Sequence, residues 1–146
     1  MSAAPGEGAP LSAGQGEGGL AFHLGEQNLQ ARAGVLAQMS QIGPRVMRDH
    51  MPEQHRAFFG LLPFVVVGSV DAQGQPWASL LVGAPGFMVS PDPQQLRIRA
   101  RPLPHDPLEH TLREGAALGL LGIQPHTRRR NRMNGTASLQ ADGLVV

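Results

Sequence analysis

Apolar residues are most concentrated between residues 63 and 82, and their order there predicts a β-hairpin. Residues 64–70 are rich in β-branched side chains and show no helical period, which is typical of a strand. Residues 71–74 then supply an aspartate followed by a glycine, as a hairpin connection requires, and residues 75–82 return as a second strand. Because both strands are largely apolar on both faces, we expect both sides of the hairpin to be covered, as in the wall of a small barrel.

The rest of the pattern predicts three helices and further short strands around this hairpin. The predicted helices are 26–42, which Gly43 and Pro44 should end, then 52–59 and 106–113. The predicted strands are 87–90, 95–101, 116–123 and 133–140. A last strand should begin at residue 144, and because the chain ends at Val146 we expect it to stop in the middle of a sheet.

Composition predicts one folded domain behind an unfolded tail. Residues 1–20 are rich in Gly, Ala and Pro and contain no basic residue, so they cannot bury enough apolar surface to offset the entropy of ordering. We expect them to be disordered. Residues 21–146 should form a single domain, with a helical part at 24–60 and a barrel at 63–146.

The amino-acid inventory excludes several kinds of chemistry. The chain has no Cys, so disulfides, thiolate zinc sites and cysteine nucleophiles are ruled out. All 12 basic residues are Arg, which removes Schiff-base lysines and Walker-type phosphate loops. The 6 His show no metal-ligand spacing, and we expect no metal site. No apolar run approaches the roughly 20 residues of a membrane span, and the expected location is cytoplasmic.

Two arginine-rich segments are the main candidates for a binding site. Residues 128–132 carry the densest charge of the chain, between two predicted strands, and Arg97, Arg99 and Arg101 form one face of another strand. Guanidinium groups match phosphate oxygens and keep their charge, so the segments indicate an anion site if they point to one place. The alternative is a solvated basic surface, the commoner meaning of a charge run.

The orientation of side chains within these strands can be predicted from the two-residue period. If residues 129–132 remain extended, Arg130 and Arg132 share one side, and Arg129 and Asn131 share the other. In the second hairpin strand, Trp77 and Ser79 share a face. A Trp at such a position is more often core than stacking platform, and the Ser79 hydroxyl needs a hydrogen-bond partner among its apolar neighbours.

The order of these blocks resembles that of a known family. The residues that carry the likeness are 51–56, 62–70, 76–81, 120–123 and 126–135, the last beginning His-Thr followed by Arg and an amide residue. Together they make the chain, over about residues 22–140, resemble the FMN-binding split barrels, and more narrowly the pyridoxamine 5′-phosphate oxidase-like flavin-nucleotide-binding proteins.

The resemblance implies a mainly β fold with flanking helices, arranged as an antiparallel Greek-key split β-barrel. It further implies a homodimer that holds FMN at the subunit interface. In the family, the strand that matches residues 77–82 lines the flavin, and Asn131 matches an amide residue near the flavin ring. The family often continues past the point where Val146 ends this chain, so we expect a fragment of a longer flavoprotein.

The chain departs from the family pattern at two positions that are basic in the oxidase, so we expect other residues to hold the phosphate. The oxidase has basic residues where this chain has Trp77 and Val82, so the phosphate should be held by one of the two arginine segments. The oxidase segment that helps to hold pyridoxal phosphate has no counterpart, which argues against vitamin B6 chemistry. The candidate cofactor-binding residues are Trp77, Ala78, Ser79, Leu80, Arg97, Arg99, Arg129, Arg130, Asn131 and Arg132.

Three functions are compatible with these features. The first is an FMN-dependent oxidoreductase of this class with an unknown substrate, in which no side chain is an evident catalytic acid or base. The second is a flavin-binding or flavin-storage module without turnover, which the sequence does not separate from the first. The third, a nucleic-acid-binding β-domain, ranks last, because the net charge is only +1 and no aromatic residue lies between the arginines of either segment.

Overall fold

A computed structural model describes residues 21–146 of the chain, so the expectation of a disordered tail over residues 1–20 lies outside the described residues. The described chain belongs to two compact units, which meet in the sequence between Arg48 and Asp49. The predicted helical part at 24–60 is divided between these units. No helix of the described chain is long and apolar enough to cross a membrane.

The described part of the first unit, residues 21–48, holds the helices α1 (Leu24–Arg32) and α2 (Leu36–Val46), which contact each other. The prediction of one helix over residues 26–42 is wrong, because the chain turns at Gly34, whose φ of 72° ends a right-handed helix. The predicted end at Gly43 and Pro44 is also wrong. Helix α2 continues through Pro44, which has no N–H to donate to the Ser40 carbonyl, and runs to Val46.

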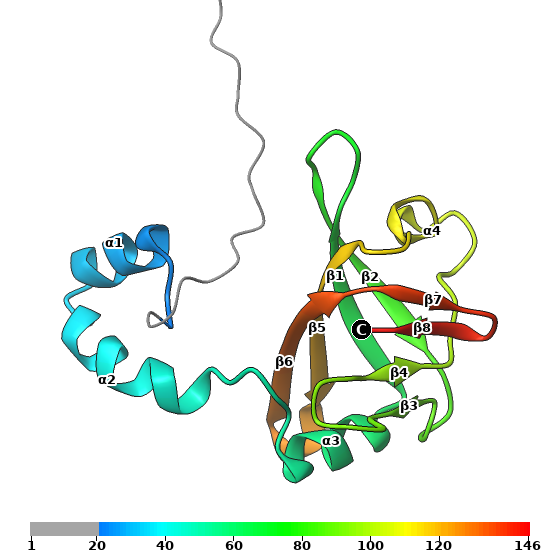
Figure 1. Ribbon diagram of the computed structural model, residues 1–146, viewed down its shortest axis with the longest axis horizontal. Coiled ribbons are helices and arrows are strands. Elements are labelled where there is room, and N and C mark those ends of the chain that lie inside the picture. The colour runs from blue at the N-terminus through cyan, green and yellow to red at the C-terminus, as the bar shows by residue number, and fades with distance from the viewer. Residues whose placement is uncertain (1–20) are drawn as a thin grey trace, which may run out of the picture. The chain divides into compact units, whose positions relative to one another are not determined.

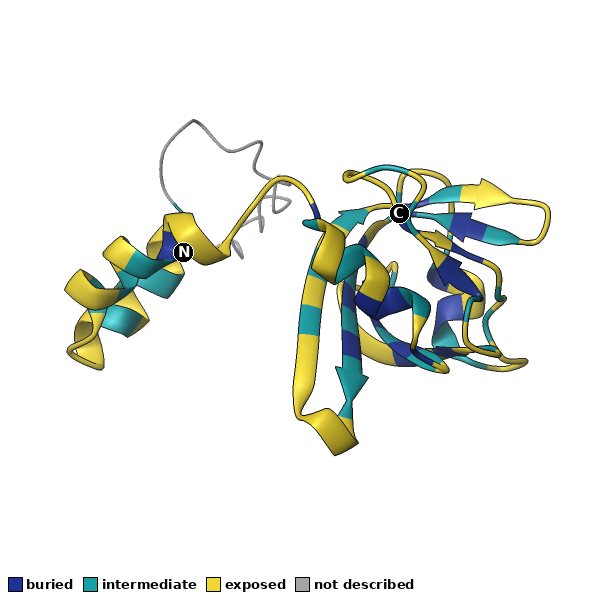
Figure 2. Cartoon of the chain, turned by 90° about the horizontal axis from the view of Figure 1, so that it is seen from below, coloured by how far each residue is buried: buried dark blue, intermediate teal, exposed yellow. Residues whose placement is uncertain are grey.

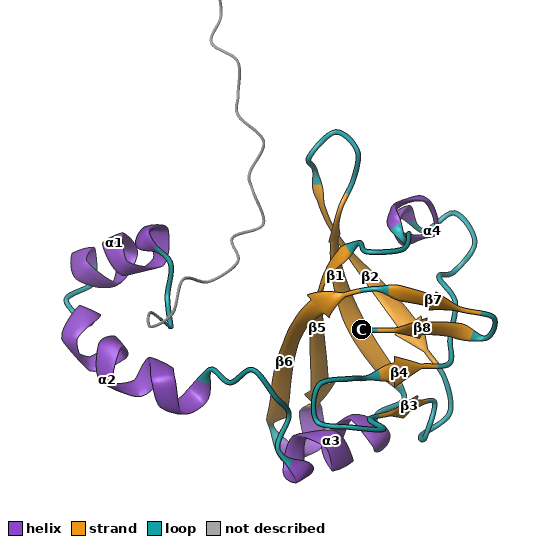
Figure 3. Ribbon diagram, in the orientation of Figure 1, coloured by secondary structure: helices purple, strands orange, loops and turns teal. Residues whose placement is uncertain are grey.

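The second unit holds eight strands and two further helices (Figures 1 and 3). The helices are α3 (Glu53–Gly60) and α4 (Pro107–Thr111). The strands are β1 (Phe64–Val70), β2 (Pro76–Val82), β3 (Met88–Val89), β4 (Arg97–Ile98), β5 (Ala117–Gln124), β6 (Arg129–Thr136), β7 (Ser138–Gln140) and β8 (Gly143–Val145). One turn of 3-10 helix, Pro125–Thr127, joins β5 to β6.

The strands form two antiparallel four-stranded sheets. The first, which we call the hairpin sheet, has the order β2-β1-β5-β6, and the second, the C-terminal sheet, has the order β3-β4-β8-β7. The prediction of a mainly β fold with flanking helices is confirmed. The predicted barrel is not seen as a closed one, because the pairing in the described chain leaves two separate sheets.

Several predicted strands differ in extent from the observed ones. The hairpin at 64–82 is confirmed almost to the residue. The strands expected at 87–90 and 95–101 shrink to β3 and β4, which are two residues long, and Pro91 and Pro93 lie in the turn between them. The strand expected at 133–140 is wrong as a single element, because the buried Ala137 separates β6 from β7 and the chain passes there from one sheet to the other.

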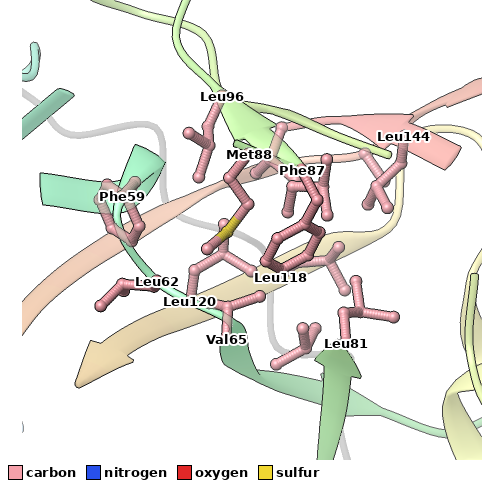
Figure 4. Packing of buried hydrophobic residues seen from close by; sticks show 14 of the residues in the cluster. Phe59, Leu62, Val65, Leu81, Phe87, Met88, Leu96, Leu118, Leu120 and Leu144 are labelled. Atoms are coloured by element: carbon pink, nitrogen blue, oxygen red, sulfur yellow. The ribbon is translucent and has the colours of Figure 1, made fainter. Parts of the chain in front are cut away.

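The hydrophobic core lies between the two sheets and α3. Side chains from both sheets meet there (Figure 4), and α3 contributes Phe58 and Phe59, whose rings pack edge to face. The core residues seen from close by are Phe59, Leu62, Val65, Leu81, Phe87, Met88, Leu96, Leu118, Leu120 and Leu144. Alternate side chains of β1 and β5 therefore enter the core, whereas β2 contributes Leu81 and β6 contributes only the partly buried Met133.

The other face of the hairpin sheet is not covered by its own chain. Burial alternates along β1, and in β2 the side chains of Leu80 and Val82 are 44% and 48% exposed. Figure 2 shows buried and less buried residues alternating along strands of the second unit. The expectation that both sides of the hairpin are covered is therefore wrong for the single chain. The sheet has one core face and one apolar face directed away from the core, which we call the outer face.

Candidate functional site

Strand β6 places its arginines on two different sides. Arg130 and Arg132 are exposed and lie opposite Ile123 and Leu121 of β5, on the outer face. Arg129 points the other way, and its guanidinium carbon lies 4.8 Å from the centre of the buried Phe58 ring. The predicted alternation is confirmed. The expectation that residues 129–132 lie between strands is wrong, because β6 begins at Arg129.

The start of β6 and the start of α3 together enclose a polar cavity of about 390 Å³, which we call the basic cavity. Its lining consists of Gln54, His55, Arg128, Arg129, Arg130 and Asn131. Three of these side chains are permanent cations, and none is a carboxylate. A cavity with this lining is suited to an anion with several oxygen atoms, such as a phosphate.

Local backbone structure holds the arginines of the basic cavity in place. Arg128 follows the 3-10 turn and adopts a left-handed conformation, with φ 56° and ψ 23°, while its N–H donates to the Pro125 carbonyl. A residue with a Cβ atom pays about 1 kcal/mol for this conformation, so the turn tolerates some strain. The neighbouring Arg129 is fixed by its contact with Phe58, an interaction worth roughly 0.5–1 kcal/mol.

The charge of this segment is not neutralised by the described part of the chain. The arginine ion pairs between residues 21 and 146 are Arg56–Glu53 and Arg97–Asp142. No arginine of β6 or its preceding turn takes part in one. An anion that entered the basic cavity would therefore not have to displace a carboxylate.

The arginines of the second segment form hydrogen bonds within their own chain. Arg97 donates to both carboxylate oxygens of Asp142 at 3.1 Å, Arg99 donates to the Gly86 carbonyl at 2.7 Å, and Arg101 donates to the Ala141 carbonyl. None of the three lines the basic cavity. The structure therefore does not bring the two predicted arginine segments together at one cavity.

Strand β2 contributes two polar side chains with intramolecular partners. The Ser79 hydroxyl, only 3% exposed, donates to Oδ1 of Asp106 at 2.5 Å, and the same carboxylate caps α4 by accepting from the Leu108 N–H. The predicted need of Ser79 for a partner is confirmed. This hydrogen bond ties β2 to the start of α4, so that Ser79 has a structural role in the single chain.

Trp77 is not a core residue but lies at the end of the hairpin, 45% exposed. Its indole N–H donates to Oδ2 of Asp71 at 2.8 Å. That hydrogen bond, followed by the one from the Gln75 backbone N–H, lowers the pKa of Asp71 below its usual value. The expectation that Trp77 belongs to the core is therefore wrong, and its ring is held at the surface instead.

The outer face joins β2 to β6 in two adjacent rows of paired residues. One row contains Leu80, Val66, Leu121 and Arg132, and the next contains Ala78, Gly68, Gly119 and Asn134. Ala78 and Leu80, two of the predicted cofactor-binding residues, lie on β2 at one end of these rows. Arg132 and Asn134 lie on β6 at the other end. Asn134 was not among the cofactor-binding residues predicted from the sequence.

Sequence reasoning also missed Gln54 and His55, which line the basic cavity. They belong to a block that carries the family likeness, residues 51–56, but no chemical signal marked them as ligands. Their distance in sequence from β6 hides the association, which only the packing of α3 produces. Among residues 21–146, no group of three or more His, Asp or Glu side chains is placed to hold a metal ion.

Comparison with known families gives the class of the protein. A family model described as pyridoxamine 5′-phosphate oxidase matches residues 51–145, which cover nearly all of the second unit. The chain belongs to the pyridoxamine 5′-phosphate oxidase family. No curated protein and no solved structure matches the chain. The family supports a flavin-binding, oxidoreductase-like function.

Proposed function

We propose that the chain binds FMN and acts as an oxidoreductase-like flavoprotein, with the FMN phosphate in or beside the basic cavity. The observation that carries the proposal is the set of unpaired guanidinium groups at the start of β6 in a chain of this family. Arginine recognises phosphate through charge and a matching fork of N–H donors. The donor chemistry of the cavity therefore fits the phosphate of a flavin nucleotide.

Side chains near the arginines suit the remainder of the nucleotide. Asn131 offers both a donor and an acceptor at the cavity, and the exposed apolar residues Ala78 and Leu80 lie on the outer face that β6 borders. A bound FMN would supply one- and two-electron transfer. The residues of the chain would bind it, orient it and limit the access of water.

The proposal includes a homodimer. The outer face exposes Val70 of β1 and Leu80 and Val82 of β2, beside the partly buried Val66, and an exposed apolar patch often marks an interface. A second copy of the chain would cover this face and form shared clefts at its borders, where Arg130 and Arg132 lie. The flavin would then contact both copies.

A titration with two flavins tests the phosphate assignment. Riboflavin lacks the phosphate, so we expect FMN to bind the full chain much more tightly than riboflavin, as followed by flavin fluorescence. The variant Arg113→Gln should bind both flavins as the parent chain does, because Arg113 is exposed and does not line the basic cavity. It is the control for the loss of an arginine elsewhere on the chain. Equal affinities of the parent chain for FMN and riboflavin would contradict the assignment.

A flavin-binding module without turnover is the second candidate. The observation that favours it is the absence of any carboxylate from the lining of the basic cavity, which therefore offers no acidic side chain as a proton donor or acceptor. Anaerobic mixing of the flavin-loaded chain with NADH or NADPH distinguishes the two. Bleaching of the flavin spectrum indicates an oxidoreductase, and an unchanged spectrum with both donors favours the module.

A further inference from the structure

Two glycines face each other in the middle of the hairpin sheet. Gly68 of β1 pairs with Gly119 of β5, and the ladder on the β2 side continues without a bulge. Both belong to the outer face, because the residues next to them in sequence, Val67 and Leu118 among them, are buried in the core. A glycine inside a strand is less favourable than an alanine, because it loses more backbone entropy on folding, so a pair of them calls for a structural explanation.

The chain itself gives no reason for the glycine pair. Neither residue has a positive φ, the conformation that favours glycine. A Cβ atom on Gly68 would lie 3.5 Å from the Gly119 carbonyl oxygen, and one on Gly119 would lie 3.4 Å from Oδ1 of Asn134, which are ordinary contacts. Gly122 is different, because a Cβ atom there would lie 2.8 Å from Leu62 in the core. The missing side chains at the glycine pair therefore leave room for something outside the chain.

The residues around the glycine pair indicate what that occupant is. On the first three strands, the row Ala78–Gly68–Gly119 carries nothing larger than a methyl group, and the adjacent row Leu80–Val66–Leu121 carries large apolar side chains. On β6 the two rows end in the polar Asn134 and Arg132. A low row beside a high row makes the face complementary to another copy of itself. Such self-complementarity is what an interface with two-fold symmetry requires.

The size of the outer face is consistent with a second copy. Four strands at about 4.8 Å spacing and seven residues of about 3.3 Å give a projected face of roughly 440 Å². Two copies would bury at least about 900 Å², and more because the side chains corrugate the surface, which is close to the roughly 1,000 Å² of a specific interface.

We infer that the glycine pair is a contact point for a second copy of this chain, which lays an apolar side chain of its Leu80–Val66–Leu121 row on the backbone of β1 and β5. This inference rests on the dimer of the proposed function and not on its flavin. A methyl group at Gly68 or Gly119 would separate the two faces, and two-fold symmetry would repeat the clash. The glycines therefore favour assembly at the expense of strand stability.

Sedimentation of the full chain, with and without added FMN over a micromolar concentration range, tests the inference. We expect Gly68→Ala and Gly119→Ala to raise the dimer dissociation constant by about tenfold or more. Unfolding measured at a dilution where every variant is monomeric should show equal or higher stability, because alanine is the better strand residue. Gly60→Ala is the matched control: its added methyl group lies 3.6 Å from the Met88 carbonyl oxygen, away from the outer face, and it should leave dimerisation unchanged.

Four results would overturn the inference. Dimerisation of both glycine variants at the parent's affinity would show that nothing approaches the pair closely. Reduced stability of the monomeric variants would show that the chain itself needs the glycines. A monomeric parent would overturn both the glycine contact and the proposed dimer, while the flavin titration would still decide the proposed cofactor separately. A monomeric parent whose glycine variants lose FMN affinity would assign the surface to the flavin instead.

Discussion

The two arginine-rich segments of this protein differ in whether the chain itself already binds them. Arg97, Arg99 and Arg101 donate to a carboxylate or to carbonyl groups of neighbouring loops, and thereby help to hold the C-terminal sheet together. The segment from Arg128 to Arg132 forms no ion pair within residues 21–146 and borders a cavity. A row of arginines is therefore a candidate anion site where no carboxylate of the same fold pairs with it.

The strongest test of this difference is to remove arginines from the unmatched segment. We expect at least one of Arg129→Ala, Arg130→Ala and Arg132→Ala to weaken FMN binding by about 2–3 kcal/mol, or roughly 30- to 150-fold, because a phosphate dianion loses its partner. Titration by flavin fluorescence measures the effect, and riboflavin affinity should change little. FMN binding at the parent's affinity in all three variants would mean that the arginines of β6 are only surface.

A smaller effect is expected from salt, which should weaken FMN binding if the arginines of the unmatched segment contact the phosphate. Because the basic cavity is open to solvent, raising the ionic strength from about 0.1 M to 1 M shortens the screening length from roughly 10 Å to 3 Å and should weaken FMN binding several-fold. Riboflavin affinity should stay nearly constant over the same range. A salt response that is the same for both flavins would argue that the arginines do not contact the phosphate.

Removing an arginine from the matched segment should affect stability and not FMN binding. Arg97→Ala loses an ion pair whose side chains are both about half exposed, so we expect the free energy of unfolding to fall by roughly 0.2–1 kcal/mol. Urea unfolding of Arg97→Ala, Asp142→Ala and the double variant isolates the pair. A large loss of FMN affinity in Arg97→Ala would remove the distinction between the two segments.

The smallest expected effect concerns Asp71, whose carboxylate already accepts hydrogen bonds from its own chain. Its pKa is lowered in the folded chain, so its contribution to stability is present above its usual pKa and is lost as the pH falls through the lowered value. Trp77 is the only Trp of the chain, and its fluorescence should change in that acidic range as the indole loses its acceptor. The transition should be absent from Asp71→Asn, and its persistence there would assign it to another group.

The local parts of the fold could be predicted from the sequence. The β1–β2 hairpin follows from two apolar runs around an Asp–Gly turn, and the alternation of Arg129 and Arg130 follows from the strand period alone. Helix α4 follows from an aspartate cap and a proline at the first position. Each of these features depends on interactions between residues close in sequence.

Features that depend on distant partners could not be predicted. Nothing in the sequence pairs Arg97 with Asp142, or brings His55 of α3 to the start of β6. The missing cover on the outer face was also hidden, because an apolar strand looks the same whether its own chain or another molecule covers it. The break at Gly34 was missed because a single glycine does not interrupt the apolar pattern of a helix.

The pairing of β1 with β5 has a consequence for how the chain folds. The hairpin sheet is made of two hairpins, β1–β2 and β5–β6, each closed by a connection of only a few residues, whereas β1 and β5 are joined over three residue pairs about 50 residues apart. Each hairpin can form within microseconds, but their docking requires closure of the long intervening loop. We therefore expect docking of the two hairpins to be the slow step of folding, with Val66–Leu121 and Val67–Leu120 as the side-chain pairs that first hold them together.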